Sequence, residues 1–288
     1  MNENVSMRLS LALLILLGSL SVSASEFDET KALAEQGDAD AQFALGYNYY
    51  AGIGAPQDYK EALRWYRASA EQGDQYAQSS LALMYKQGEG TPQDYKEAVR
   101  WYLASAEQGY AMAQHNLALM HYNGEGTPKD YKEAVRWFRA SAEQGYASAQ
   151  FNLAFMYKNG EGTPQDYKEA FKWFSASAEQ GNDGAQNNLA VLYSNGEGTL
   201  QNYKEAMKWY RASAEQGYTQ GQFNLALMYV REEGVPQDYK SAHMWWSIAA
   251  ASDHAGAAKN RDKVAGMMTP AEISEAQQMA SDWIKAHP

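Results

Sequence analysis

The feature that most constrains this chain is a unit of 36 residues that recurs six times without an insertion or a deletion. A Gln-Gly pair precedes the first copy and ends each of the first five, and an Asp-Tyr pair, replaced once by Asn202-Tyr203, lies in the middle of each copy. A fixed period of roughly 20–50 residues is the signature of a stacked array, in which each unit contacts its neighbours. The chain of 288 residues is therefore predicted to form a repeat array rather than two globular domains.

The first half of each repeat is predicted to be a helix. In the third copy, Ala113, Leu117 and Met120 recur at helical spacing and share one face. The helix is expected over about residues 111–122. Gly124 follows shortly afterwards, and glycine at this place is a helix-ending signal.

The second half of each repeat is predicted to be another helix. In the third copy, Asp130 is a favourable N-cap, and Glu133 three residues later completes a capping-box pattern. One such hairpin cannot bury its apolar face alone, so neighbouring hairpins must stack on both sides. The chain is thus expected to be all-α. The core is expected to contain Ala134, Phe138 and Ala142, together with the in-register tryptophans Trp65, Trp101, Trp137, Trp173, Trp209 and Trp245.

The recurring pattern reads Ala-x3-Leu-(Ala/Gly)-x2-Tyr-x2-Gly-x-Gly, then a short loop with proline, then Asp-Tyr-x2-Ala-x2-Trp and Ala-x-Ala. It resembles the Sel-1-like repeat family, a relative of the tetratricopeptide repeats. The resemblance covers residues 38–253, with a half-repeat at each end. It implies an α/α solenoid of helical hairpins, wound as a right-handed superhelix, that serves as a protein-binding scaffold.

The repeat register divides the chain into four parts. Residues 25–37 match the end of a repeat and are predicted to be an N-terminal capping half-repeat. Residues 254–288 are predicted to be C-terminal capping helices. The six repeats between them are predicted at 38–73, 74–109, 110–145, 146–181, 182–217 and 218–253.

Residues 1–24 are predicted to be a secretory signal peptide. Arg8 precedes an apolar run of about a dozen residues, which is too short to span a bilayer comfortably. Val22-Ser23-Ala24 fits a cleavage site with small residues at both key positions. The mature chain is expected to be exported, periplasmic or secreted, without a membrane span. Because the chain has no cysteine, its stability must come from stacking rather than from disulfides.

The C-terminal end departs from the repeat pattern. In the sixth repeat, Glu232 replaces the first turn glycine, and the second helix reads SAHMWWSIAA, which predicts deeper burial against a C-terminal cap. Thr269, Pro270 and Glu272 then predict the start of a final helix with a capping box. The apolar stripe of that helix is expected to comprise Ile273, Ala276, Met279, Ala280 and Trp283.

No catalytic or metal-binding constellation is present in the sequence. The recurring Gly-Glu-Gly segment links two predicted helices and lacks a preceding strand, so it is a turn rather than a phosphate loop. His115 and His121 are six residues apart and do not share a helix face. A net charge of −11 argues against a nucleic-acid partner. No cofactor, metal or catalytic residue is therefore predicted.

One face of the first helix varies from copy to copy and is the predicted partner-binding surface. Positions 4, 8 and 12 of the repeat hold Ala, Leu and Tyr with few exceptions, whereas positions 3, 6, 10 and 13 lie on another face and diverge. By analogy with tetratricopeptide repeats, these divergent positions line a concave groove, where aromatic side chains anchor a peptide or helix. The predicted contact residues are Phe43, Tyr47, Tyr50, Tyr76, Lys86, His115, Tyr122, Phe151, Phe155, Lys158 and Phe223. Exposure is favoured at positions 6 and 13, while position 10 fits exposure and packing between first helices equally well.

Three functions fit these observations. The leading one is an exported, non-enzymatic scaffold that binds a protein or peptide partner in an envelope, signalling or host-interaction role. Cysteine-rich members of the resembled family are associated with penicillin binding and β-lactamase activity, so a β-lactam- or cell-wall-directed hydrolase is the alternative. This chain lacks both the cysteines and a serine hydrolase motif. The third is a self-assembling rod, whereas the caps at both ends predict a monomer.

Overall fold

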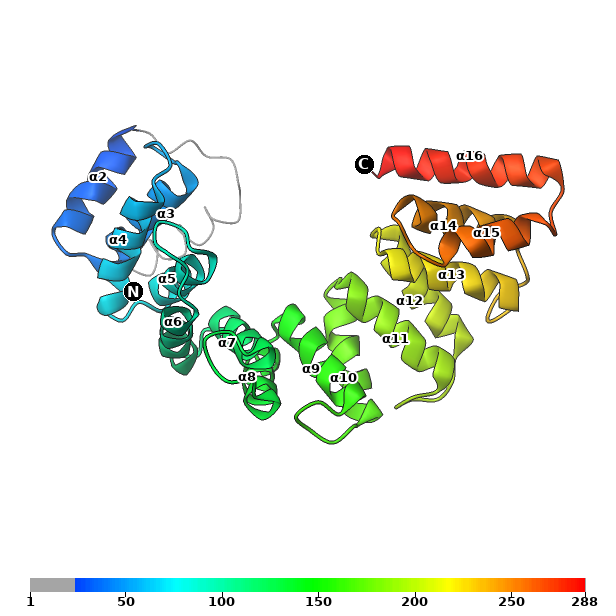
Figure 1. Cartoon of the computed structure of the whole chain (residues 1–288), viewed down its shortest axis with the longest axis horizontal. Coiled ribbons are helices and arrows are strands. Elements are labelled where there is room, and N and C mark those ends of the chain that lie inside the picture. The colour runs from blue at the N-terminus through cyan, green and yellow to red at the C-terminus, as the bar shows by residue number, and fades with distance from the viewer. Residues whose placement is uncertain (1–23, 288) are drawn as a thin grey trace, which may run out of the picture. The chain divides into compact units, whose positions relative to one another are not determined.

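A computed structural model describes residues 24–287, which fold into α-helices and contain no strand (Figure 1). The predicted signal peptide, 1–24, lies outside the described residues apart from its last residue. The helices are α2 (Ala24–Glu35), α3 (Ala39–Ala51), α4 (Tyr59–Glu71), α5 (Gln75–Gln87), α6 (Tyr95–Glu107), α7 (Ala111–Asn123), α8 (Tyr131–Glu143), α9 (Ala147–Asn159), α10 (Tyr167–Glu179), α11 (Asp183–Asn195), α12 (Tyr203–Glu215), α13 (Thr219–Arg231), α14 (Tyr239–Ala251), α15 (Ala257–Ala265) and α16 (Pro270–Ala286).

These helices form two compact units that divide between Lys129 and Asp130. Unit 1 contains α2 to α7, and unit 2 contains α8 to α16. Consecutive helices pack against one another from α2 to α7 and from α8 to α15, and α16 packs against α14. Within the units, the repeats are therefore hairpins of a first and a second helix: α3 with α4, α5 with α6, α9 with α10, α11 with α12, and α13 with α14. The prediction of an all-α solenoid of helical hairpins is confirmed.

The predicted core positions are buried. The repeated leucine of the first helix is at most 1% exposed in every copy, from Leu45 to Leu225. Five of the six in-register tryptophans are buried, while Trp209 is half-buried. Fixed residues of both helices thus fill the space between hairpins, as stacking requires.

The second helices begin at a side-chain cap. The carboxylate of Asp130 accepts hydrogen bonds from the backbone N–H groups of Lys132 and Glu133, at 2.9 and 3.1 Å. The predicted capping box is wrong in its second half, because the Glu133 carboxylate accepts hydrogen bonds from Arg136 instead, at 2.9 Å. Asn202 caps α12 in the same way as aspartate, accepting from the backbone of Glu205 at 3.1 Å.

Both ends of the described chain are capped by additional helices. At the N-terminal end, α2 packs against α3, and Phe27 meets Tyr49 edge to face at 5.6 Å. At the C-terminal end, α14 is buried by α15 and α16, and Trp245 meets Trp283 at 5.8 Å. The predicted deeper burial of the sixth second helix is confirmed by Met244 and Ser247, which are half-buried, whereas the corresponding Arg64 and Arg67 of α4 are exposed.

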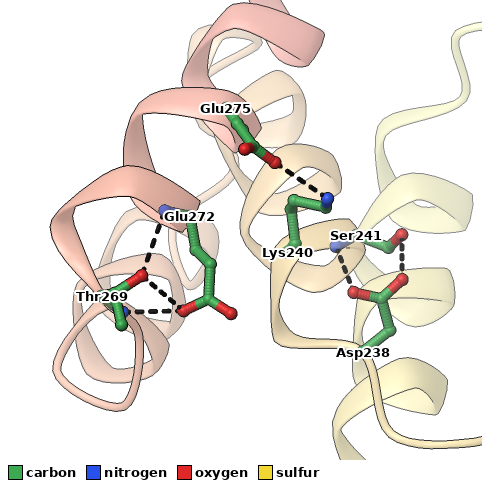
Figure 2. Close-up of polar contacts among 6 residues, drawn as sticks. All are labelled: Asp238, Lys240, Ser241, Thr269, Glu272 and Glu275. Atoms are coloured by element: carbon green, nitrogen blue, oxygen red, sulfur yellow. Dashed lines mark hydrogen bonds and ion pairs between the residues drawn. The ribbon is translucent and has the colours of Figure 1, made fainter.

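The capping box predicted for the last helix is present (Figure 2). The Thr269 hydroxyl accepts from the backbone N–H of Glu272 at 3.3 Å, and the Glu272 carboxylate accepts from the Thr269 backbone at 2.8 Å. An ion pair of 3.0 Å between Lys240 and Glu275 joins this helix to α14. Within the predicted stripe, Ala276 and Ala280 are buried, Ile273 and Trp283 are half-buried, and Met279 is exposed.

Candidate partner-binding surface

The divergent face of the first helices is positioned by contacts between neighbouring repeats. In unit 1, Phe43 of α3 lies 6.1 Å from Tyr76 of α5, and Tyr76 meets Tyr110, just before α7, at 5.0 Å. In unit 2, Lys158 of α9 donates to Asn188 of α11 at 3.0 Å. Residues from adjacent first helices therefore lie side by side within each unit, as the prediction of a shared surface requires.

Large apolar side chains are exposed on this face. At position 3, Tyr76 and Met112 are 46% and 41% exposed, and at position 10, Leu83 and Phe155 are 38% and 37% exposed. The hydroxyl of Tyr110 lies 3.7 Å from the sulfur of Met112. We call Tyr76, Leu83 and Met112, all in unit 1, the apolar strip. Packing between first helices leaves these position 10 side chains more than a third exposed.

Position 6 is less accessible than the sequence suggested. The expectation of exposure is wrong for Ser79, His115 and Asn187, which are buried. Burial lowers the pKa of His115 to about 4, so its imidazole is neutral near pH 7. A buried side chain offers little surface to a partner, and His115 therefore fits a core position.

The three phenylalanines at position 6 are half-buried because they pack against aromatic rings of the second helices. Phe43 lies 5.7 Å from Tyr66, and Phe151 lies 5.8 Å from Phe174. Phe223 lies 6.2 Å from Trp246 and stacks on His254 at 4.3 Å. Position 6 thus packs against the second helix of its own repeat, and its aromatic rings contribute to the core as well as to the surface.

Position 13 is half-buried, and so is Tyr47 at position 10. Lys86 forms an ion pair of 3.0 Å with Glu125, which comes from the turn of the next repeat. Burial lowers the pKa of Lys158, and the charge of Glu197 partly offsets that effect. Burial is also the largest cause of the raised pKa of Tyr50, followed by a hydrogen bond with Glu89. Tyr122 is likewise half-buried. Tyr50, Lys86 and Lys158 at position 13 therefore lie near the Gly-Glu-Gly turn of the following repeat.

The sequence reasoning missed a polar contact that joins neighbouring repeats. Gln78, buried in α5, donates to the carbonyl of Ala70 at 3.2 Å and accepts from Gln108 at 2.8 Å. Gln108 also donates to the carbonyl of Gly73 at 2.9 Å. A glutamine fixed in every copy at the middle of an otherwise apolar face was the available signal. The buried glutamines at this position are Gln42, Gln78, Gln114, Gln150, Gln186 and Gln222.

Two other classes of site are absent from residues 24–287. No group of three or more His, Cys, Asp or Glu side chains there could hold a metal ion. Among the same residues, no helix is long and apolar enough to cross a membrane.

Comparisons with known proteins agree with this architecture. The family model described as Sel1 repeat matches residues 39–74, 75–110, 111–146, 147–182, 184–218 and 219–254. A search of curated proteins returned no match. The chain is similar to a protective antigen of uropathogenic Escherichia coli that displays an SLR fold, with 38% identity and a TM-score of 0.81. That likeness covers 89% of this chain and 56% of the antigen.

A second solved structure is a Sel1 repeat protein from Oxalobacter formigenes. Its identity to this chain is 33% and its TM-score is 0.66. The likeness covers 74% of this chain and 86% of the Oxalobacter protein. Six matched repeats, together with helical hairpins in the same register, show that the chain belongs to the Sel1 repeat family.

Proposed function

We propose that this chain is an exported, non-catalytic scaffold that binds a protein or peptide partner on the divergent face of its first helices. The observation that carries the proposal is the apolar strip of unit 1, where three large side chains stay 38–46% exposed although the core around them is filled. Apolar side chains gathered on one face are typical of an interaction surface, whereas scattered ones need no explanation. The Sel1 repeat family supports an interaction role.

The second helix of the same repeat provides a matched control for this surface. Leu103 of α6 is 36% exposed, almost the same as Leu83 of α5. A variant with Tyr76→Ser and Leu83→Ser removes two anchors from the first helix, whereas Leu103→Ser removes a comparable side chain from the second helix. Both sets of changes lie at exposed positions, so the helical fold should survive, and circular dichroism checks this.

The test is a cross-linking capture with the native chain and both variants. We expect a partner that the native chain and Leu103→Ser retain and that the double variant loses. Loss of the partner from Leu103→Ser alone would place the contact on the second helices and contradict the proposal.

Export and absence of catalysis are tested separately. N-terminal sequencing of the protein recovered from outside the cytoplasm should begin at Ser25, as the predicted cleavage site requires. A chromogenic β-lactam assay should show turnover at the level of the buffer. Sustained turnover by the purified chain would favour the hydrolase alternative.

A further inference from the structure

An open pocket of about 400 Å³ lies in unit 2, where the fifth repeat meets the sixth. Its volume is within the range of pockets that hold small ligands. The pocket is lined by Asp183, Gln216, Gly217, Tyr218, Thr219, Gln220 and His254. None of these lining residues is Lys or Arg, and Asp183 is the one carboxylate among them.

The pocket takes the place of a glutamine amide that other repeats contain. In the second repeat, the amide of Gln108 donates to the side chain of Gln78 at 2.8 Å and to the carbonyl of Gly73 at 2.9 Å. The first repeat contains the same pair of bonds. The sixth repeat has Ser252 at this position, whose short side chain carries no amide. Gly217, the counterpart of Gly73, lines the pocket instead.

Two acceptors of the sixth repeat consequently lack this amide. The Oε1 atom of Gln222, the counterpart of Gln78, has no hydrogen-bond partner in the described part of the chain, and Gln222 is 1% exposed. No residue within 24–287 donates to the carbonyl of Gly217 either. Gln222 is covered, whereas Gly217 is exposed, so the carbonyl is the acceptor open to a ligand. The pocket therefore favours a group that donates N–H bonds, as the glutamine amide does elsewhere.

One wall of the pocket is held in place by a chain of hydrogen bonds. Nε2 of His254 lies 3.3 Å from Oε1 of Gln220. Gln220 donates to Asn224 at 3.1 Å, and Asn224 donates to Asn187 at 2.9 Å. Nδ1 of His254 accepts from the backbone N–H of Gly256 at 3.3 Å, so the proton of the neutral ring lies on Nε2. Because these side chains already have partners, little further ordering is needed when a ligand binds.

The charge of Asp183 decides the sign of the ligand. The carboxylate raises the pKa of Tyr218, after the larger effect of burial, which agrees with their place in one pocket. The first turns of α11 and α13 oppose it, each with a partial positive charge of about half a unit. In α11, the N–H groups of Gly184 and Ala185 are already bonded to Asp183 and Asn182, at 2.6 and 2.7 Å. The full charge of Asp183 therefore exceeds the remaining half charge of α13, and the pocket favours a cation.

We propose that this pocket binds a guanidinium group, which comes from a free alkylguanidine or from an arginine side chain of another protein. A planar guanidinium presents NH2 donors as the glutamine amide does in other repeats, and it adds the positive charge that the pocket favours. One of its edges meets the carboxylate of Asp183, and another N–H donates to the carbonyl of Gly217. The ring of Tyr218 adds cation–π contact. The site lies in unit 2 and does not use the apolar strip, which belongs to unit 1.

The experiment is a ligand titration followed by the NMR signals of the His254 ring. The two main probes are N-acetyl-arginine amide and N-acetyl-citrulline amide, which share their shape and an NH2 donor but differ in charge. We expect the arginine probe to bind at least about fivefold more tightly, because hydrogen bonds to charged groups are stronger. Its affinity should fall several-fold as salt rises from about 50 to 300 mM.

Two further probes identify the source of the guanidinium. Butylguanidine represents a free small molecule, and a blocked Gly-Gly-Arg-Gly-Gly peptide represents an arginine side chain of a protein. Tighter binding of butylguanidine would assign the pocket to small molecules, and tighter binding of the peptide would assign it to a protein. Either result requires the pocket to accept a guanidinium.

Return of the missing amide tests the location of the site. Ser252→Gln should weaken binding of the arginine probe at least about tenfold, because the new side chain fills the place of the ligand. The same variant should raise the melting temperature, since Gln222 regains a partner. Ser252→Ala is the matched control, which adds no amide and should bind the probe within about twofold of the native affinity.

Removal of the charge tests the chemistry of the site. Asp183→Asn keeps the size of the side chain and should weaken binding of the arginine probe about fivefold, to the level of the citrulline probe. Asp40→Asn is its control, because Asp40 is a first-turn aspartate of α3 in unit 1. That control should stay within about twofold of the native affinity.

Contrary results would overturn the inference in distinct ways. Native affinity in a folded Ser252→Gln variant would remove the pocket as the site. Equal binding of arginine and citrulline probes, or native affinity in Asp183→Asn, would remove the guanidinium as the ligand. Tighter binding of N-acetyl-glutamate amide would show that the first turn of α13 prevails, and absence of binding by every probe at about 10 mM would exclude a site. The cross-linking capture uses residues of unit 1, so it decides the proposed function separately.

Discussion

Gly73, which ends the first repeat, and Gly90, in the second repeat, both have positive φ, but for different reasons. Gly73 has φ +96° and nothing near the position that a Cβ atom would take. Gly90 has φ +69°, and a Cβ atom there would lie 2.3 Å from the carbonyl oxygen of Tyr59 in the preceding repeat. At position 73, glycine is favoured only because the backbone has a positive φ. At position 90, the absence of a Cβ atom also allows two repeats to approach closely.

Substitution of these glycines should separate the two effects. Gly73→Ala should lower the free energy of unfolding by about 1–2 kcal/mol, which is the cost of a non-glycine residue in this backbone region. Gly90→Ala should lower it by at least about 3 kcal/mol, because the backbone of Tyr59 must also move. Urea denaturation followed by circular dichroism measures both. Equal losses would mean that the close approach at Gly90 costs nothing.

At the scale of elements, neighbouring hairpins are joined by buried amide groups as well as by apolar packing. In unit 2, Gln150 of α9 donates to the carbonyl of Ala142 at 3.2 Å and accepts from Gln180 at 2.8 Å. The hydroxyl of Ser177 also donates to the carbonyl of Ala147, in the first helix of the same repeat, at 2.8 Å. These bonds satisfy polar groups at helix ends that stacking removes from water.

Removal of one such amide should be costly because its partners stay buried. Gln150→Ala should lower the free energy of unfolding by about 1–3 kcal/mol, since it leaves the Ala142 carbonyl and the Gln180 amide without this partner. The exposed Gln277 is the control, and Gln277→Ala should change stability by less than about 0.5 kcal/mol. Thermal and urea unfolding measure the loss of stability in both variants. Equal losses would show that the buried amide of Gln150 does not contribute to stability.

The C-terminal helix depends on a charged cap, which makes its stability sensitive to acid. Hydrogen bonds from the backbone and side chain of Thr269 hold the pKa of Glu272 below its ordinary value of 4.5. A depressed pKa contributes stability that is present above the unfolded value and is lost as pH falls through the folded one. Amide exchange in α16 should therefore accelerate, relative to an uncapped reference helix, as pH falls below about 4.5.

Removal of the cap hydroxyl provides the comparison. Thr269→Ala should destabilise α16 by about 1 kcal/mol at neutral pH, the usual contribution of an N-cap. Because the variant also lacks the hydroxyl that bonds to Glu272, its acid response should be smaller than that of the native chain. An identical acid response would assign the pH dependence to another group.

At the scale of the whole molecule, stability is distributed along the repeats. Within each unit, helices pack mainly against their neighbours in the chain, so the free energy is approximately a sum of hairpin and nearest-neighbour contributions. The net charge of −11 does not define the fold, because net charge affects association and solubility in general rather than the packing of helices.

A core substitution should consequently have a local effect. Leu189 of α11 is 1% exposed, and Leu189→Ala should cost about 2–5 kcal/mol through lost burial and a cavity. Hydrogen exchange should accelerate in α10 to α13 and stay unchanged in α3 to α5. Uniform acceleration throughout the chain would contradict additive stacking.

Much of the fold could be predicted because its determinants are local and periodic. The register of Gln-Gly and Asp-Tyr pairs predicted the hairpins, and Asp130 and Thr269 predicted two helix starts that the structure contains. The candidate surface was predicted less well. Tyr76 and Phe155 are exposed as a contact would require, whereas His115 is buried, although all three belong to the same divergent face.

The sequence by itself determined the helices, their caps and the residues that must stack, because hydrogen bonding and helical periodicity act over a few neighbouring positions. Tertiary structure decided how far position 6 is covered by Tyr66, Phe174 or Trp246, and how Gln78 meets Gln108. Exposure and polar pairing depend on side chains some 20 to 30 residues away, and a variable position in the sequence does not reveal which neighbour covers it.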